Sequence, residues 1–444
     1  MGRILDVKLI NTPSPFLIND RAFVPLGLLY VAGMVRHMGH KIEILDLLGN
    51  PEYMKSIEGV KGDVFGLAAT TPQYPVAVAI MKKLKEQNPS ATFIIGGSHV
   101  TLKPQAPLHD GFDIVMLGEG ENAMKIILTQ LSETGTCDHI VQAPYMEHLD
   151  EIPYPARDLI DIKSYGYEFE PGHRATTIMT SRGCPWQCSF CAKDVFGKTL
   201  RFRSPENVAG EVKEVIETFG IRDFLFLDDV MTLNRKRIEK LLELLEPLTI
   251  NWRCYSRVDT LDRELLIKMK KAGCREIGSG VESGSQKILD SVRKGSTVAQ
   301  NTKVARLCKE VGIVFNAFVM IGLPGETYET IMETKRWFEE VLPEKFGYNI
   351  FSPYQGTDIF QNPQNYDIQL LEMPDEKSWV KGRKGEYNCF VETKDLTSDE
   401  ILRLHKELFE YFVQLTGWHK NWVDPSSKKI EMAAREVTAE TATV

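Results

Sequence analysis

Three cysteines stand close together in the segment RGCPWQCSFCAKD, residues 182–194. Cys184, Cys188 and Cys191 follow a C-x3-C-x2-C spacing, and Phe190 directly precedes the last of them. Thiolates suit iron–sulfur clusters and zinc, but a closed zinc site needs a fourth ligand, and no neighbouring C-x2-C or H-x3-H pattern supplies one. A 4Fe–4S cluster bound by three cysteines keeps one iron open, as a catalytic cluster requires. The spacing therefore predicts such a cluster, the alternative being three packing thiols that happen to be close.

The composition limits the kind of protein that can carry this motif. The chain has 444 residues, of which 43% are hydrophobic, and this is enough for two or three globular domains. A net charge of −8 argues against a surface built for nucleic acid. We find neither the apolar core of a signal peptide nor an uncharged run of the ~20 residues that span a bilayer. We therefore expect a cytoplasmic protein with no nucleic-acid partner and no stable membrane insertion, whose eight cysteines are thiols or metal ligands.

The first 145 residues alternate short apolar runs with amphipathic segments, which predicts a doubly wound parallel sheet with helices on both faces. Ligands of such folds bind beyond the carboxyl ends of the strands. No G-x-G-x-x-G or P-loop pattern is present, so a dinucleotide or P-loop phosphate site is unsupported. Glycines at several of the expected strand ends would let the backbone approach a ligand, and the alternative explanation is that they only form tight strand-to-helix turns. The candidate binding residues at the expected strand ends are Thr12, Pro13, Thr70, Thr71, Gly96, Gly97, His99, Gly118 and Glu119.

A second α/β region follows a boundary segment. Residues 146–170 combine prolines and mixed charge without a helical stripe, and we interpret them as a linker. Six strand-like runs then alternate with helix-like segments as far as residue 375, which predicts a partial (β/α)6 barrel of the TIM type. Chemistry in such barrels gathers at the carboxyl ends of the strands. The candidates at those ends are Asp228, Asp229, Ser256, Arg257, Glu282, Gly322 and Pro324.

These strand-end side chains suit a zwitterionic ligand. Carboxylates such as Asp228 and Glu282 can accept hydrogen bonds from an amino group or from hydroxyls, and Arg257 can pair with a carboxylate. Any single acid could instead cap the following helix, and for Asp229 and Glu326 both interpretations stay open.

The rest of the sequence shows no further catalytic motif. We interpret the five cysteines outside the motif as packing residues, although Cys254 could face the interior of the barrel. Residues 376–444 contain an amphipathic helix that is expected to close the barrel mouth and help to shape a substrate pocket. The tail after it is too poor in large apolar residues to need order.

The motifs, taken in order, resemble those of the cobalamin-dependent radical S-adenosylmethionine enzyme family. The similar segments are INTPSP, PLGLLYVAGMVRHMGHKIEILD, LAATTPQ, IIGGSHVT and MLGEGE in the first region, and the cysteine motif, LDDVMTLN, GVESGS, IGLPGET and SPYQGTDIF in the second. The resemblance implies a Rossmann-like cobalamin-binding domain (1–145), a linker (146–170), a partial radical S-adenosylmethionine barrel (171–375) and a small, mainly helical C-terminal region (376–444).

The resemblance also implies the cofactors. Cys184, Cys188 and Cys191 would bind a 4Fe–4S cluster, whose open iron is chelated by the amino and carboxylate groups of S-adenosylmethionine. Phe190 and the strand-end residues of the barrel would contact that cofactor. No D-x-H-x-x-G pattern occurs, so cobalamin is expected without a histidine ligand, and His99 is expected beside its nucleotide tail or as a helix cap. A flavodoxin or ferredoxin is the implied electron donor.

The activity that the resemblance implies is methyl transfer from S-adenosylmethionine, via methylcobalamin, to an unactivated carbon of a small-molecule substrate. Relatives with the same two domains carry out ring contraction or oxidative cyclisation without methyl transfer, and this is the first alternative. A non-enzymatic cobalamin or iron–sulfur carrier would not need the acids at the strand ends. A methylthiotransferase acting on tRNA would bring a different N-terminal domain and a basic RNA-binding module.

Overall fold

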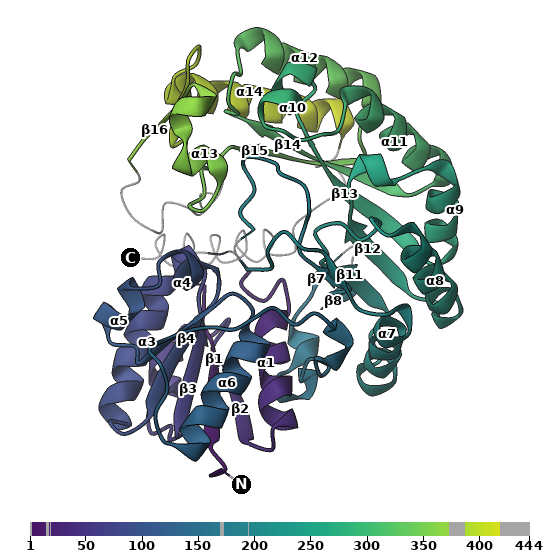
Figure 1. The fold of residues 1–444 in the computed structure, drawn as a ribbon. Coiled ribbons are helices and arrows are strands. Elements are labelled where there is room, and N and C mark those ends of the chain that lie inside the picture. Colours follow the sequence, from purple (N-terminus) through teal and green to yellow (C-terminus); the bar gives the residue numbers. More distant parts are fainter. Residues whose placement is uncertain are drawn as a thin grey trace, which may run out of the picture.

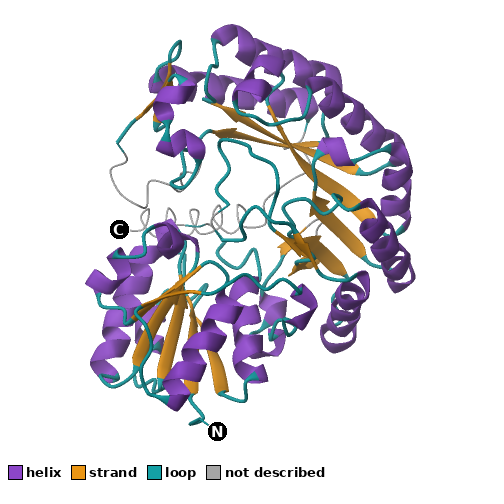
Figure 2. Cartoon of the chain, in the orientation of Figure 1, coloured by secondary structure: helices purple, strands orange, loops and turns teal. Residues whose placement is uncertain are grey.

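Two parallel sheets flanked by helices make up the two halves of the molecule (Figures 1 and 2). The computed structural model describes residues 2–14, 17, 19–168, 173–193, 195–372 and 387–417. None of the helices in these ranges is long and apolar enough to cross a membrane. The predicted disorder of the C-terminal tail falls on residues 426–444, which lie outside the described residues.

The first sheet has six strands, all parallel, in the order β2-β1-β3-β4-β5-β6. Its strands are β1 (Asp6–Asn11), β2 (Lys41–Asp46), β3 (Val64–Ala68), β4 (Thr92–Gly96), β5 (Ile114–Leu117) and β6 (Ile140–Gln142). The order reverses between β1 and β3, which is the switch point where open α/β sheets bind ligands. The predicted doubly wound fold is confirmed.

Helices cover both faces of this sheet because its strands are apolar on both sides. Ile94 of β4 packs in the cluster that includes α1 (Leu26–His37) and α6 (Gly120–Glu133), whereas its neighbours pack in the cluster of the opposite face. That opposite face carries α2 (Tyr53–Ser56), α3 (Tyr74–Gln87), α4 (Ser98–Leu102) and α5 (Ala106–Asp110). In Figure 1, α4 lies on the side of the first half that faces the second half.

The second sheet has the order β15-β14-β13-β12-β11-β8-β7. Six of its strands are parallel and form the predicted barrel units: β8 (Arg174–Ile178), β11 (Asp223–Phe226), β12 (Asn251–Tyr255), β13 (Cys274–Glu282), β14 (Val314–Ile321) and β15 (Lys345–Ile350). A short seventh strand, β7 (Tyr167–Glu168), pairs antiparallel with β8. The partial (β/α)6 barrel is confirmed, with an added edge strand.

The barrel helices lie along the convex side of the curved sheet (Figure 1). They are α7 (Pro205–Phe219), α8 (Arg235–Leu245), α9 (Arg263–Lys271), α10 (Gln286–Ser291), α11 (Val298–Val311) and α12 (Tyr328–Val341). Trp252 and Cys254 of β12 belong to the core under these helices, and Cys254 lies beside Cys274 and Cys308 of α11. Since side chains alternate along a strand, Arg253 points to the concave side and Cys254 does not. The suggestion that Cys254 faces the barrel interior is therefore wrong.

The C-terminal part extends the barrel at β15. It contains α13 (Asp358–Gln361), a small antiparallel pair of β16 (Ile368–Leu370) and β17 (Val391–Thr393), and the long helix α14 (Ser398–Thr416). The ring of Phe412 in α14 stacks on that of Phe338 in α12, with 3.8 Å between ring centroids. It meets the ring of Tyr348 in β15 edge-on, with 5.3 Å between centroids. This helix therefore covers the convex side next to β15. The expectation that it closes the barrel mouth is wrong, because its apolar face packs where the helices of the barrel pack.

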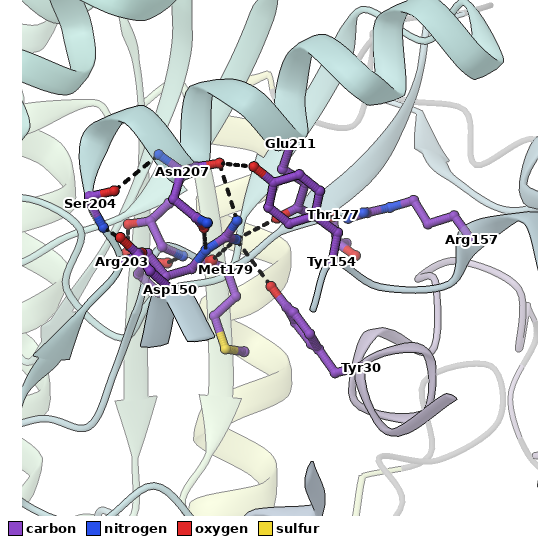
Figure 3. A network of polar contacts seen from close by, with 12 residues as sticks. Tyr30, Asp150, Tyr154, Arg157, Thr177, Met179, Arg203, Ser204, Asn207 and Glu211 are labelled. Atoms are coloured by element: carbon purple, nitrogen blue, oxygen red, sulfur yellow. Dashed lines mark hydrogen bonds and ion pairs between the residues drawn. The ribbon is translucent and has the colours of Figure 1, made fainter. Parts of the chain in front are cut away.

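The connecting segment between β6 and β7, residues 143–166, packs against one helix from each half. It contains the short turns Leu149–Glu151, Arg157–Leu159 and Ile162–Ser164. A Cβ on Gly33 of α1 would lie 2.6 Å from the carbonyl oxygen of Tyr154. A Cβ on Gly210 of α7 would lie 2.7 Å from the Tyr154 hydroxyl oxygen. The Tyr154 hydroxyl donates to the Asn207 carbonyl of α7 at 2.8 Å, as Figure 3 shows. The two halves are thus joined by close packing through this segment.

Candidate functional site

The cysteine loop leaves the first barrel strand, as the sequence predicts. It runs between β9 (Ser181–Arg182) and β10 (Arg201–Phe202), which pair antiparallel so that Arg182 lies opposite Arg201. Cys191 is exposed, but crowding by surrounding protein atoms raises the pKa of its thiol to about 11, and the neighbouring thiols Cys188 and Cys184 add to this rise. Metal binding at this loop must therefore displace the protons of Cys184 and Cys191.

The loop offers soft ligands but no finished metal site. In the part of the chain that the structure describes, no three His, Cys, Asp or Glu side chains are grouped as a metal ion would require. Cys184 and Cys188 are partly buried and Cys191 is exposed, so all three are on an accessible loop. Three thiolates on one short loop fit the donor set of an iron–sulfur cluster, which the loop would have to fold around.

The end of β12 reaches the cysteine loop through Arg257. Its guanidinium lies 4.4 Å from the ring centroid of Trp186, and one of its nitrogens is 3.9 Å from the sulfur of Cys188. It also donates to the carbonyl of Lys294 at 2.8 Å and pairs with Asp259 at 2.8 Å. The structure therefore brings Arg257 and Cys188 together, and the pairing of Arg257 with a cofactor carboxylate stays a prediction.

The end of β13 lies on the same side of the loop. Glu282 is buried and its carboxylate pairs with the ammonium of Lys294 at 2.6 Å. The same ammonium lies 5.8 Å from the ring centroid of Phe190, the aromatic residue of the cysteine motif. Neither Lys294 nor Trp186 was singled out in the sequence. A lysine before a glycine in VRKGST looks like an ordinary turn residue, and only the fold reveals its burial.

The two aspartates after β11 have different surroundings. Asp228 is buried, and its carboxylate accepts hydrogen bonds from the Thr180 amide at 2.6 Å and from the Ser181 hydroxyl at 2.8 Å. It therefore fixes the bend that leads from β8 into the cysteine loop. Asp229 is exposed, although crowding by protein atoms and the charge of Asp228 raise its pKa. Burial raises the pKa of Cys184, and the charge of Asp229 adds to this rise.

The remaining barrel candidates serve the fold. The hydroxyl of Ser256 bonds with those of Thr232 and Thr260. The Gly322 amide donates to the Glu326 carboxylate at 2.6 Å, so this acid caps the turn after β14. A Cβ on Gly322 would meet Val391 and Ile401 of the C-terminal part, and the Pro324 carbonyl accepts from the Ser291 hydroxyl at 2.9 Å. Contacts of Ser256, Gly322 and Pro324 with a cofactor stay predictions.

The predicted ligand edge of the first sheet is held together by contacts between its loops. The Gln73 amide, after β3, donates to the Thr12 carbonyl, after β1, at 3.0 Å. His99 and Thr71 are joined at 3.2 Å, which links the loops after β4 and β3. Helix α4, which follows β4, is linked to the loop after β5 because the Gly118 amide donates to the Thr101 hydroxyl at 3.1 Å. The strand-end residues Thr12, Pro13, Thr70, Thr71, Gly96, Gly97, His99, Gly118 and Glu119 therefore lie along one edge.

This edge has features that fit a bulky ligand. The buried hydroxyl oxygen of Thr12 has no hydrogen-bond partner among the described residues. Gly97 has φ +103°, and a Cβ there would lie 2.8 Å from the Ala69 carbonyl oxygen, so only glycine fits where the chain after β4 passes the end of β3. The ring of His99 is buried against Tyr74, with 4.3 Å between ring centroids. His40 lies at the start of β2, where it accepts from the Leu5 amide at 3.3 Å.

Glu119 departs from the expected picture of a ligand contact. Its carboxylate forms two bonds with the Arg201 guanidinium, at 2.5 and 3.0 Å, and thus joins the ligand edge to the base of the cysteine loop. The neighbouring acid Glu121 and the two arginines Arg182 and Arg201 were missed in the sequence. The sequence shows the alternating GEGE of residues 118–121 and the arginine before the first cysteine, but it contains no sign that these acids pair with the arginines.

Each half of the chain matches a known protein family. Residues 22–128 match the family described as B12 binding domain, and residues 178–338 match the Radical SAM superfamily. An uncharacterized methyltransferase of Pyrococcus horikoshii is 33% identical over 411 residues that cover 87% of this chain and 87% of the relative. The anaerobic magnesium-protoporphyrin IX monomethyl ester cyclase of Cereibacter sphaeroides is 29% identical and covers 90% of this chain, while the match covers 70% of that protein.

A solved structure shows the same fold over nearly the whole chain. The radical S-adenosylmethionine methyltransferase TsrM of Kitasatospora setae, which holds cobalamin and a 4Fe–4S cluster, matches with a TM-score of 0.71 at 17% identity. The match covers 96% of this chain and 90% of that one. Together with the cysteine loop and the ligand edge, these matches show that the chain belongs to the cobalamin-dependent radical S-adenosylmethionine enzymes, whose cofactors are cobalamin, S-adenosylmethionine and a 4Fe–4S cluster.

Proposed function

We propose that this enzyme moves a methyl group from S-adenosylmethionine, by way of cobalamin, to an unactivated carbon of a small-molecule substrate. The observation that carries the proposal is the ion pair between Glu119 and Arg201, because it joins the edge of the cobalamin-binding half to the base of the cysteine loop. Two cofactors that must exchange a group need their sites next to each other. The name of the Pyrococcus horikoshii relative supports a methyltransferase.

The bound cofactors would supply the radical chemistry and the methyl carrier, while the protein positions them and excludes water. Cys184, Cys188 and Cys191 would hold the cluster. Arg257 lies beside Cys188 and would orient the carboxylate of S-adenosylmethionine after exchanging its bond with Asp259. Asp229 follows β11 at the carboxyl end of the barrel strands and is exposed, so it would accept from the amino group of that cofactor.

The first sheet would hold cobalamin at its carboxyl edge. The hydroxyl of Thr12 has no hydrogen-bond partner among the described residues and follows β1, next to the switch point between β1 and β3, where open α/β sheets bind ligands. Gly97 follows β4 at the same edge. We propose that His99 supports this edge rather than binding the cofactor's metal, because its ring is buried against Tyr74. A flavodoxin or ferredoxin is proposed as the electron donor.

One relative favours a second candidate function. The Cereibacter sphaeroides protein is named as a ring-forming cyclase, and its match covers 90% of this chain. In that case the enzyme would use the same two sites for an oxidative cyclisation, and no methyl group would reach the product.

The two candidates differ in where the methyl group goes. Purified enzyme would be supplied anaerobically with iron, sulfide, hydroxocobalamin and a strong reductant, followed by S-adenosylmethionine labelled on its methyl group. The proposal expects label in the protein-bound cobalamin fraction and 5′-deoxyadenosine in solution. Formation of 5′-deoxyadenosine with no label in cobalamin would replace methyl transfer by the cyclase-type reaction. A Cys188→Ala variant, which lacks one cluster ligand, serves as the control and should give no 5′-deoxyadenosine.

A further inference from the structure

The base of the cysteine loop carries two arginines in direct opposition. Arg182 ends β9 and Arg201 begins β10, and they are partners in the antiparallel ladder that closes the loop. Like charges that face each other across a ladder are destabilising unless something neutralises them. Both side chains are at most 7% exposed, so water does not neutralise them. The carboxylates that do so must come from elsewhere in the fold.

Each arginine is neutralised by an acid of the cobalamin-binding half. Arg182 binds both carboxylate oxygens of Glu121, at 2.6 and 3.2 Å, and Arg201 binds both oxygens of Glu119, at 2.5 and 3.0 Å. A cross-contact of 3.5 Å joins Arg182 to Glu119. The two acids are at most 4% exposed. Two parallel bonds between planar groups fix direction as well as distance.

The two acids sit where the ligand edge ends. Glu119 follows the Gly118 turn after β5 and precedes α6, and Glu121 lies in the first turn of that helix, where negative charge is favoured. Gly118 is tied to helix α4, which follows β4, through Thr101. The four-residue cluster therefore connects the edge proposed for cobalamin to the two ends of the loop proposed for the iron–sulfur cluster.

We propose that Glu119, Glu121, Arg182 and Arg201 act as an inter-domain latch that sets the separation between cobalamin and the iron–sulfur cluster. They are positioning residues: they act through the two loops they join. The latch is rigid because a shift of either half would leave buried charges without partners. The inference rests on the proposed function, in which a group must pass between the two cofactor sites.

The test uses the full-length enzyme and the double variant Glu121→Gln/Arg182→Gln. Neutralising both partners removes this ion pair without leaving an unpaired buried charge, because Glu119 and Arg201 still pair with each other, so the double variant is the one expected to fold if the single variants do not. Enzyme and variant are loaded with iron, sulfide and hydroxocobalamin. Cobalamin affinity is measured by absorbance titration, iron content by analysis, and the distance between cobalt(II) and the reduced cluster by pulsed electron paramagnetic resonance.

If the four residues act as a latch, the variant should bind both cofactors, but the distance between them should be less well defined. Iron content should be unchanged, and the cobalt-to-cluster distance distribution should broaden or shift. Transfer of the labelled methyl group to cobalamin should fall at least about tenfold, because small misplacements between reacting groups cost large factors in rate. Formation of 5′-deoxyadenosine, which needs only the barrel, should stay within about threefold of the parent enzyme.

Glu276→Gln is the matched control. Glu276 is also a buried acid with two cationic partners, Lys345 at 2.7 Å and Arg253 at 3.8 Å, but all three lie within the barrel. This variant should lower the unfolding temperature and leave the cobalt-to-cluster distance distribution as it is. An unchanged distance distribution in the double variant would overturn the latch. If the parent enzyme binds both cofactors but moves no label, methyl transfer fails as the function, and the distance comparison still decides the latch.

Discussion

The pKa values of two buried acids in this protein are shifted in opposite directions because their neighbours differ. Glu326 is fully buried, and burial raises its pKa to about 8 despite two backbone hydrogen bonds to its carboxylate. For Glu211, burial also favours the protonated form, but Arg157 and Arg203 outweigh it and lower its pKa. The first acid favours folding when it is protonated, and the second when it is charged.

Glu326 gives a pH-dependent prediction. Its pKa rises from 4.5 to about 8 on folding, so its contribution to stability is present below pH 4.5 and is lost as the pH rises through 8. Glu326→Gln keeps an oxygen that can accept from the Gly322 amide but cannot ionise. Its free energy of unfolding, minus that of the parent, should therefore rise by about 4 kcal/mol between about pH 5 and about pH 9. Urea titrations at both pH values measure this difference, and parallel pH profiles would contradict it.

At the scale of elements, helix α1 shows how closely the two halves approach. Gly33 packs against the carbonyl of Tyr154 in the connecting segment, whereas Gly27 of the same helix has no described atom within 4 Å of the place where a Cβ would lie. The Ala156 amide also donates to the Leu29 carbonyl of this helix at 3.0 Å. One face of α1 therefore has no room for even a methyl group, while its first turn is open.

The two glycines make a matched pair of variants. Gly33→Ala should destabilise the protein by about 1–3 kcal/mol, because the added methyl group must push the helix away from Tyr154. Gly27→Ala should be neutral or stabilising by up to about 1 kcal/mol, since alanine favours a helix and meets no obstacle. Thermal unfolding of the two variants measures the contrast. Equal effects at both positions would show that the contact with Tyr154 carries no cost.

The longer elements could be predicted from the sequence, and the shortest could not. The barrel strands are short segments rich in apolar, aromatic and β-branched residues, and in β14 and β15 the buried residues alternate with partly exposed ones, so such strands can be recognised in the amino-acid sequence alone. β9 and β10 have two residues each, which is too short for any periodic pattern. Of the predicted site, the cysteines, Arg257 and Glu282 meet in one region, but the partner of Glu119 is 82 residues away in the chain. A single sequence contains no signal for such a pairing.

At the scale of the whole molecule, one buried acid joins three parts of the chain. Glu211 of α7 binds Arg157 of the connecting segment at 2.6 Å and also binds Arg203 after β10 (Figure 3). Arg203 in turn donates to the hydroxyl of Tyr30, on α1 of the cobalamin-binding half, at 3.1 Å. The connection between the halves therefore depends on a carboxylate that neutralises two guanidinium groups.

Removing that carboxylate should weaken the whole molecule. Glu211→Gln leaves two buried guanidinium groups without a counter-ion, and we expect it to lower the free energy of unfolding by about 3–5 kcal/mol. Glu214→Gln, on the exposed side of the same helix, should change it by less than about 0.5 kcal/mol. Denaturant titrations compare the two variants. A loss of similar size in both would contradict a special role for Glu211.

The pairing of Glu119 and Glu121 with Arg182 and Arg201 also limits how such enzymes can be recombined. A chimera that joins this barrel to a cobalamin-binding half from a relative would inherit both arginines at the base of the cysteine loop. Unless the donor half supplies two carboxylates at the same places after its fifth strand, the exchange buries two cations without counter-ions. A graft boundary in the connecting segment separates the two acids from the two arginines, so it should succeed only when the donor half carries both carboxylates at these places.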